Sequence, residues 1–410
     1  MDADQVDLAS VDLMDGGLHA EGPPHEVLER LRSECPVHQA SYNGQRYWSF
    51  VRDAEVVEVS RDPQSFSSGR AGIFLNPDQV APIDLLRNVL LYKDPPEHSK
   101  YRRILSPLFT PKAVKKWESA VREQVDRALD AVIESGRCDF VSDIAVPVPL
   151  GVLAALIGVP DDDIDQLYRW THEIERAQQS DQPAAATETF IEMTGYLHQL
   201  IQQQIAEGGD SLVTRLREAQ VDEESLSDDE ILTFFGLLVF AGNDTTRNTT
   251  ATGMLALLEN PEQWQFLRDN PDRLPQIVEE VLRYTSVVKY FARTATHDTE
   301  VGGHQIAEGD KVVIWFDSAS RDESLNDDPE RFDVTRENAQ HRAFGGGGPH
   351  FCLGNNLARL ELRILFEQIA LRMPDIALDG SAEHLRSNWA HALTSMPVTF
   401  SASAPTKAGA

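Results

Sequence analysis

Hydrophobic residues recur at helical spacing through most of the chain, and only a few short segments alternate between apolar and polar positions. Alternation with a period of two predicts a strand, because successive side chains point to opposite faces of a sheet. The helical patterns fill the middle of the chain, with no internal repeat and no Pro/Ser-rich linker. The pattern predicts a mainly α fold with small β-sheets, whose strands include Tyr47 to Val51, Val301 to Ile306 and Lys311 to Trp315.

One long helix has well-marked ends. Ser227 is followed three residues later by Glu230, the pattern of a capping box, and Asn260-Pro261 stops the periodic pattern after Glu259. At 1.5 Å per residue this helix would be roughly 48 Å long, so it must pass through the core. Its first half is apolar all round, but the sequence turns polar abruptly at residues 243–246. This segment alone leaves two interpretations open, a helix that emerges into solvent and a functional site.

The chain of 410 residues has 66 acidic and 37 basic residues and a formal charge of −29. That charge argues against nucleic acid or an anionic membrane as the main partner. Three cysteines, no export signal and no apolar run long enough to cross a bilayer predict a soluble, cytoplasmic protein. Residues 1–22 contain acids but no Lys or Arg, and the final segment SASAPTKAGA is small and polar, so we expect both ends, 1–22 and 400–410, to be poorly ordered.

The most informative segment is a run of four glycines before Cys352, followed by a helical pattern from Asn355 to Met373. Glycines allow a close approach of the backbone, and a cysteine just before a helix N-terminus has its thiol pKa lowered by the dipole and the free amides. A thiolate held in this way is suited to bind iron. Glycine runs alone instead favour a flexible turn with a buried cysteine. A phosphate-binding loop is excluded, because neither Gly-x-Gly-x-x-Gly nor Gly-Lys-Ser/Thr is present in the required context.

The cysteine loop resembles the haem-binding loop of the cytochrome P450 monooxygenases, specifically the soluble bacterial type. It matches the family's Gly-x-His-x-Cys-x-Gly core and the small residue one helical turn further on at Gly348, His350, Cys352, Gly354 and Ala358. The resemblance covers about residues 23–399 and implies one domain of the cytochrome P450 fold. Haem b (iron protoporphyrin IX) is then expected between the long central helix and the cysteine-loop helix, with Cys352 as the axial iron ligand.

The loop departs from the family pattern at one position. Most soluble members have Phe seven residues before the cysteine, where this chain has Gly345, and Phe344 lies one residue further back. Some bacterial steroid- and lipid-oxidising members also have this spacing. Phe344 is our candidate for the residue beside the haem, and which side chain shields the sulfur stays open.

The polar turn of the long helix resembles the family's oxygen-activation motif. Cleavage of dioxygen needs protons at its distal oxygen, and an acid beside an alcohol on a locally opened helix can relay them from water. By resemblance, Ala241 and Gly242 lie against the haem and Gly242 makes room for dioxygen. Thr245 would hold the hydrogen bond to dioxygen, and Asp244 would be the proton source. The resemblance favours a functional site over a helix end in solvent.

Two further motifs are similar to those of the family. Glu280 and Arg283 resemble its Glu-x-x-Arg pair, and Arg331 stands at the place of the third partner. The resemblance implies that these three lock the loop that carries the cysteine. A second set of basic residues is expected to bind the two haem propionates through charge-assisted hydrogen bonds: His98, Arg102, Arg293 and His350.

The resemblance implies an enzyme that inserts one oxygen atom of O2 into a C–H bond of an apolar small molecule and passes the other into water. Terpenoids, steroids, fatty acyl chains and small aromatics are all compatible with the sequence. The alternatives are a haem-thiolate peroxygenase, a branch that lacks the Asp244-Thr245 pair, and a non-catalytic haem sensor, which needs no proton relay. We expect a monomer.

Pocket residues follow from helical spacing along the long helix and, by resemblance, from the segments Ile73 to Leu91, Thr285 to Phe291 and Trp389 to Thr394. We expect an apolar wall, with Lys289 in solvent beside it. The predicted lining residues are Phe234, Leu237, Leu238, Val287, Val288, Phe291 and Leu393.

The negative charge is unevenly distributed. Residues 93–116 contain five of the chain's eight lysines and have a net charge of +5. Composition alone favours a solvated helix face. By resemblance, the segment lies near the cysteine loop on the side that receives electrons. We therefore expect an acidic ferredoxin, reduced by an NAD(P)H-dependent ferredoxin reductase, to dock on Arg103, Lys112, Lys115 and Lys116.

Overall fold

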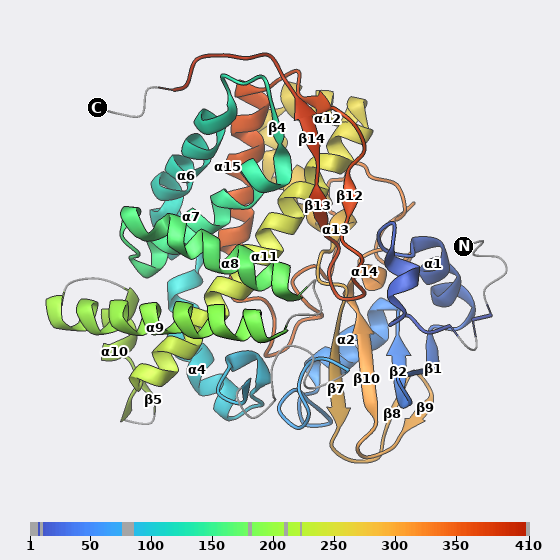
Figure 1. Cartoon of the computed structure of the whole chain (residues 1–410). Helices are drawn as coiled ribbons and strands as arrows, with labels where there is room; N and C mark the ends of the chain where they lie inside the picture. The colour runs from blue at the N-terminus through green and yellow to red at the C-terminus, as the bar shows by residue number, and fades with distance from the viewer. Residues whose placement is uncertain are drawn as a thin grey trace.

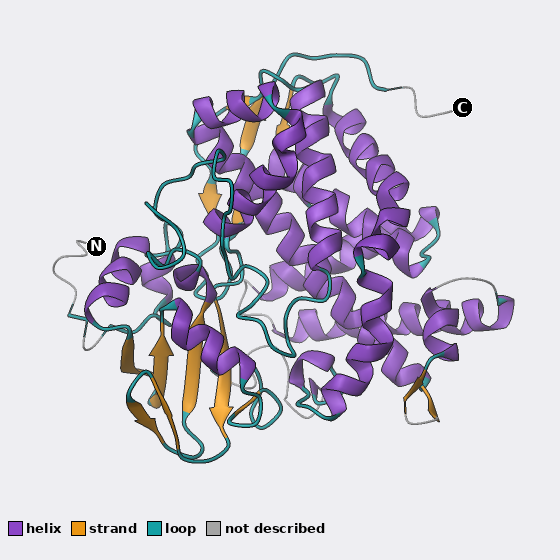
Figure 2. Ribbon diagram, turned by 180° about the vertical axis from the view of Figure 1, so that it is seen from behind, coloured by secondary structure: helices purple, strands orange, loops and turns teal. Residues whose placement is uncertain are grey.

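The computed structural model describes residues 7–8, 11–75, 86–178, 183–208, 212–221 and 224–406. Helices make up the larger part of the molecule, and a twisted sheet lies at one side of them (Figures 1 and 2). The fold is therefore mainly α with small β-sheets, as predicted. The helices are α1 (His25–Glu34), α2 (Asp53–Arg61), α4 (Glu97–Leu105), α5 (Pro111–Val114), α6 (Glu118–Val132), α7 (Pro147–Ile157), α8 (Ile164–Gln178), α9 (Pro183–Glu207), α10 (Leu212–Glu218), α11 (Asp228–Glu259), α12 (Pro261–Asp269), α13 (Leu274–Thr285), α14 (Phe316–Ala319) and α15 (Asn355–Arg372).

The largest sheet has five strands in the order β1-β2-β10-β7-β3. Strand β10 pairs in parallel with β2 and antiparallel with β7, and it reproduces the predicted strand from Lys311 to Trp315. The strands are β1 (Val37–Tyr42), β2 (Gln45–Phe50), β3 (Phe66–Ser67), β4 (Arg137–Asp139), β5 (Gln220–Val221), β6 (Glu224–Ser225), β7 (Tyr290–Ala295), β8 (Thr299–Val301), β9 (His304–Ile306), β10 (Lys311–Trp315), β11 (Ala377–Leu378), β12 (Glu383–His384), β13 (Leu393–Ser395) and β14 (Pro397–Thr399).

Both faces of this sheet are buried, which explains the unbroken apolar run of β10. Val313 and Trp315 pack with α1 and the N-terminal segment on one face, whereas Val312 and Ile314 pack with α2 on the other. A separate and larger core fills the space among the helices and continues as far as Phe400. The site described below lies where this helical core meets the sheet.

The long helix α11 forms as its sequence predicts. Ser227 and Glu230 make the capping box in both directions, and the helix ends at Glu259 before Asn260 and Pro261. It packs against α7, α9, α13 and α15. Its polar second half is buried, not in solvent: the buried residues are Asn243, Thr246, Arg247, Asn248, Thr249, Thr250 and Thr252.

Two expectations from the sequence are wrong. The single strand expected over 301–306 is a hairpin of β8 and β9, because Gly302 and Gly303 both have positive φ and turn the chain. The N-terminal segment is not disordered in its described part, since Leu13 and Met14 are fully buried against the sheet. At the other end, the backbone of Thr406 donates to Asp130 of α6.

In the described ranges, no helix combines the length and the apolar character that crossing a bilayer requires.

Candidate functional site

The cysteine loop runs from Phe344 to Gly354 and ends at the N-terminus of α15. The amide of Cys352 donates to the carbonyl of Phe344 (3.0 Å), which closes the loop, and Asn355 donates its side-chain amide to the carbonyl of Cys352 (2.8 Å). Burial raises the pKa of the Cys352 thiol, while amides of Gly354 and Asn355 and the charge of Arg102 lower it. The helix N-terminus lowers the pKa of the thiol, as the sequence predicts, but burial raises that pKa by more.

The glycines of this loop are required by its contact with α2. A Cβ on Gly346 would lie 2.4 Å from Oγ of Ser60, and one on Gly348 would lie 2.2 Å from the carbonyl oxygen of Ser60. Gly348 also has a φ of +71°, whereas Gly345 has a φ of +97° but open space around its missing side chain. The close approach expected from the sequence is therefore an approach to the C-terminal end of α2.

Phe344 lies on the core side of the loop and Phe351 on its surface. The Phe344 ring packs against the helical core and meets the Phe351 ring edge-on at 6.4 Å between centroids. The guanidinium of Arg359 lies 4.5 Å from the centroid of the Phe344 ring, a distance typical of cation–π contacts. Phe344 therefore packs within the loop, although it lies one residue further from Cys352 than the usual Phe.

Four basic side chains predicted from separate parts of the sequence meet beside this loop. The rings of His98 and His350 lie 4.3 Å apart, and Arg102 donates to the carbonyl of Phe351. Burial, then the charges of Arg293 and its neighbours, lowers the pKa of His350 to about 2, and burial lowers that of Arg293 to about 10. The buried Nδ1 of His98 has no hydrogen-bond partner.

This cluster is suited to hold two carboxylates. Burial, and then the neighbouring positive charges, lowers the pKa values of His98 and His350. Bound carboxylates would favour the charged forms and give His98 Nδ1 a partner. The haem propionates have the required charge. Cys352 at the start of α15 supplies the thiolate that haem iron takes as a ligand. The residues present therefore fit haem.

Asp94 organises this cluster and was not singled out from the sequence. It accepts hydrogen bonds from the hydroxyl of Ser67 and the amides of Ser68 (2.8 Å) and Gly69 (3.2 Å), and Ser68 Oγ lies 3.3 Å from Nε2 of His350. The signal that could have found it is its position directly before Pro95-Pro96 and α4, where an acidic residue orders a turn.

Glu361 is a second residue that sequence reasoning missed. It lies on α15 nine residues after Cys352, is fully buried, and has one carboxylate oxygen without a partner. Burial raises its pKa well above the ordinary value, so the carboxyl group is neutral. The sequence signal that could have found Glu361 is its helical spacing from Ala358, which places both residues on the same face of α15.

The polar turn of α11 brings its predicted residues together on an unbroken helix. The hydroxyl of Thr245 donates to the carbonyl of Ala241 (2.6 Å), and Asp244 forms an ion pair with Arg247 at 3.5 Å. A Cβ on Gly242 would lie 3.1 Å from Leu153 of α7. Gly242 therefore allows α11 to pack closely on α7, and its expected role of making room for dioxygen stays a prediction. Ala241 is the exposed residue of this turn.

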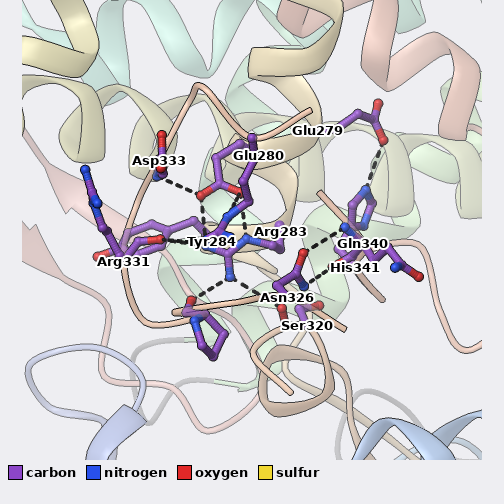
Figure 3. Close-up of polar contacts among 12 residues, drawn as sticks. Glu279, Glu280, Arg283, Tyr284, Ser320, Asn326, Arg331, Asp333, Gln340 and His341 are labelled. Carbon is purple, nitrogen blue, oxygen red and sulfur yellow. Dashed lines mark hydrogen bonds and ion pairs between the residues drawn. The ribbon is translucent and has the colours of Figure 1, made fainter. Parts of the chain in front are cut away.

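Glu280 and Arg283 form a fully buried pair on α13, with N–O distances of 2.6 and 2.9 Å (Figure 3). Arg283 also donates to the carbonyls of Pro329 (2.6 Å) and Arg331 (3.0 Å). The expectation that the Arg331 side chain is the third partner is wrong. That side chain is exposed, and the third cation is Arg336, 3.4 Å from Glu280.

A small aromatic cluster joins the predicted pocket segments. Ile73, Phe74 and Tyr92 are buried in it, and Phe291 and Trp389 pack against them, with the Phe74 and Trp389 rings edge-on at 5.7 Å. Part of the segment from Ile73 to Leu91, residues 76–85, lies outside the described residues.

The other predicted pocket residues are dispersed. Val288 packs on the sheet, and Val287 is buried. Leu237 is half-buried on α11. Phe234, Leu238 and Leu393 belong to the helical core. Phe234 also lines a small hollow between α4 and α11, together with Tyr101 and Glu230.

The four predicted docking residues are exposed beside the cysteine loop. Arg103, Lys112, Lys115 and Lys116 follow one another through α4, α5 and the turn after it. Asn356 of α15 donates to the carbonyl of Phe109 (2.9 Å), which fixes this segment to the loop helix. A hollow of about 570 Å³ opens between α4, the segment that follows it and the cysteine loop. It is lined by His98, Ser99, Arg102, Arg103, Ser106, Pro107, Thr110 and Pro349.

Comparisons with known proteins show which family the chain resembles over most of its length. A family model described as Cytochrome P450 matches residues 181–373. A steroid C26-monooxygenase of Mycolicibacterium smegmatis is 35% identical over 95% of this chain and 93% of its own. A methyl-branched lipid omega-hydroxylase of Mycobacterium tuberculosis is 38% identical over 87% of this chain and 85% of its own. The structure of a Mycobacterium marinum cytochrome P450 in complex with pseudoionone superposes with a TM-score of 0.87 and 33% identity, over 97% and 98% of the two chains.

Proposed function

The chain belongs to the cytochrome P450 family, whose members are haem-thiolate monooxygenases, and we propose that it hydroxylates a steroid or a methyl-branched lipid. The observation that carries the proposal is the meeting of Cys352, at the start of α15, with the basic cluster around His98 and Arg293. That arrangement fits haem with a thiolate ligand. The substrate class rests on the two relatives named as acting on steroids and on methyl-branched lipids, each matched over most of its length.

Haem bound between α11 and α15 supplies the redox chemistry that activates dioxygen. Cys352 would be the iron ligand, and Phe344 would lie beside it under the guanidinium of Arg359. His98, Arg102, Arg293 and His350 would bind the propionates. Glu280 and Arg283 hold the segment around Pro329 in place and act through structure alone.

Asp244 and Thr245 would deliver protons. The hydroxyl of Thr245 donates a hydrogen bond to the carbonyl of Ala241, which leaves the lone pairs of the hydroxyl oxygen available to accept a hydrogen bond. Asp244 is partly exposed at the helix surface and can take protons from water, while its ion pair with Arg247 sets its resting position.

The aromatic cluster around Phe74, Phe291 and Trp389 is the proposed wall of the substrate pocket. Its apolar rings suit a sterol skeleton or a branched alkyl chain, which binds by burial of apolar surface more than by hydrogen bonds. Terpenoids and small aromatics, also compatible with the sequence, are less favoured because the two named relatives act on steroids and lipids.

Electrons would come from a ferredoxin that is reduced by an NAD(P)H-dependent reductase. The exposed residues Arg103, Lys112, Lys115 and Lys116 lie on the segment beside the cysteine loop, where Arg103 lines the hollow, in a protein of net charge −29. An acidic partner is attracted to this face and repelled elsewhere. We also propose a cytoplasmic monomer, with Cys352 bound to iron and neither Cys35 nor Cys138 in a disulfide.

The proposal is tested by incubating the haem-loaded protein with NAD(P)H, a ferredoxin, its reductase, and a panel of steroids and methyl-branched lipids. The expected product carries one hydroxyl group whose oxygen comes from labelled O2. Parallel incubations with hydrogen peroxide and no ferredoxin test the peroxygenase alternative. Equal product formation in those incubations, or no turnover of any lipid under either condition, would contradict the proposed function.

A further inference from the structure

Lys289 is buried behind the proposed pocket wall, although the sequence suggested that it is solvated. Its side chain is fully inaccessible. Its Nζ donates to the carbonyl of Ser387 (2.6 Å) and lies 3.0 Å from Nδ1 of His19. Nε2 of His19 lies 2.9 Å from the carbonyl of Leu13, so Nε2 is the donor and Nδ1 accepts from the ammonium group.

The backbone on either side of Lys289 joins two segments of the pocket. Its amide donates to the carbonyl of Trp389 (2.9 Å), and the amide of His391 donates to the carbonyl of Val287 (2.8 Å). Val288 and Ala390 form the bridge between these two bonds. Segments 287–291 and 387–391 are therefore paired by a single β-bridge, a ladder too short to be rigid by itself.

The N-terminal segment braces the same ladder from behind. Asn388 donates to the carbonyl of Met14 (2.7 Å), and Arg386 donates to that of Gly16 (3.0 Å). The His19 ring lies parallel to the ring of Trp315 on β10, at 6.4 Å between centroids. Lys289 is thus the point at which the pocket wall, the N-terminal segment and the sheet are tied together.

The charge of Lys289 has little local compensation. The nearest carboxylate that acts on it is Asp317, which is also buried and whose Oδ2 has no hydrogen-bond partner. Burying such a pair costs more than burying an apolar side chain of similar size, so the ammonium group is not explained by stability. The ammonium group instead contributes orientation, because its hydrogen bonds hold the carbonyl of Ser387 and the ring of His19 in place.

We propose that Lys289 is a positioning residue for substrate specificity, which sets the separation of segments 287–291 and 387–391 and so the shape of the pocket end that Phe291 and Trp389 line. The inference rests on the proposed function, since it concerns the pocket of the same reaction. The two aromatic rings project from the braced segments into the cluster with Phe74. A shift of either segment changes the width of that cluster.

The contacts of Lys289 with Ser387 and His19 should respond to alkaline pH. Burial lowers the pKa of Lys289 to about 8, against the opposing charge of Asp317. Burial lowers the pKa of His19 to about 4 and that of His391 to about 3, and it raises that of Asp317 to about 6. Other ionisable groups that face the cluster are His25 and His384, whose pKa values burial also lowers, and the arginines Arg32 and Arg321. Of the shifted pKa values in this cluster, that of Lys289 lies between pH 7 and 9.

The test compares Lys289→Met with the wild type and with Arg372→Met as a matched control. Arg372 is a mostly buried cation that binds Asp126 and Asp130 of α6, away from the pocket. Lys289→Met should weaken the binding of apolar ligands, followed by the Soret shift, by about tenfold at pH 7, since a charge-assisted hydrogen bond is lost. It should also yield a broader set of hydroxylated products. Arg372→Met should lower thermal stability and change neither readout.

A hydrogen-exchange measurement tests the role of Lys289 without knowledge of the substrate. Amide exchange of segments 287–291 and 387–391 should be faster in Lys289→Met than in the wild type. In the wild type, the exchange rate of these segments should increase between pH 7 and 9 by more than the intrinsic pH dependence of amide exchange. Unchanged exchange, or ligand binding equal to that of Arg372→Met, would overturn the inference. Asn388→Ala, which removes only the bond to Met14, gives a milder version if Lys289→Met does not fold. Absence of lipid turnover in the wild type contradicts the proposed function but leaves the exchange test decisive for Lys289.

Discussion

Replacing Arg283 with methionine should destabilise the protein far more than any change at Arg331. The substitution keeps most of the apolar volume but leaves the carboxylate of Glu280 fully buried, with only the amide of Asp333 (2.8 Å) and the more distant Arg336 (3.4 Å) as partners. The carbonyls of Pro329 and Arg331 also lose a donor. Breaking a buried pair by removing one partner costs about 3–5 kcal/mol.

That loss is large against a total stability of about 5–15 kcal/mol. For a chain of 410 residues the unfolding entropy is roughly 0.9 kcal/mol per degree, so the melting temperature should fall by about 4–6 °C. Because Arg283 holds the segment that leads to the cysteine loop, the haem content of the purified variant should fall as well. The measurements are calorimetric unfolding and Soret absorbance per mole of protein.

Arg331→Ala is the matched control, because only the backbone carbonyl of Arg331 takes part in the network and its side chain is exposed (Figure 3). Its effect should stay within about 0.5 kcal/mol. Arg336→Ala should lie between the two. A melting temperature of Arg283→Met within one degree of the wild type, or an Arg331→Ala variant as unstable as Arg283→Met, would refute this reasoning.

The other predictions concern proton delivery, electron entry and the loop glycines. Thr245→Ala should keep substrate binding but divert reducing equivalents to hydrogen peroxide, measured as product formed per NAD(P)H consumed; unchanged coupling would remove Thr245 from the relay. Replacing Lys115 and Lys116 together by glutamate should slow reduction by the ferredoxin and weaken its dependence on ionic strength, and stopped-flow rates equal to those of the wild type would exclude docking there. Gly348→Ala should lose haem binding because its Cβ meets the backbone of Ser60, whereas Gly345→Ala should fold with only backbone strain; equal haem content in the two would contradict the close contact with α2.

Elements with local signals could be predicted from the sequence. The capping box fixes the start of α11 and Asn260-Pro261 its end, and the glycine run before Cys352 marks the start of α15. These signals lie within a few residues of the feature that they determine. The cluster of His98, Arg102, Arg293 and His350 came from resemblance, because no local pattern relates residues that are up to 252 positions apart.

Features that depend on distant contacts were missed or assigned wrongly. The segment after Pro329 folds back on α13 and so brings the side chain of Arg336, and not that of Arg331, to Glu280. A short sequence motif does not specify this path of the chain. The N-terminal segment looked disordered because it is acidic, yet Leu13 and Met14 find their apolar partners on a sheet formed by residues far along the chain. Lys289 looked solvated because its partners, His19 and Ser387, are 270 and 98 residues away.

The central claim is that Cys352 binds haem iron as a thiolate, and one spectrum tests it directly. The reduced, haem-loaded protein exposed to carbon monoxide should show the strongly red-shifted Soret band of a thiolate-ligated haem, and Cys352→His, with haem bound, should lack it. Correctly folded wild-type protein with an unshifted band would contradict thiolate ligation and the function proposed from it.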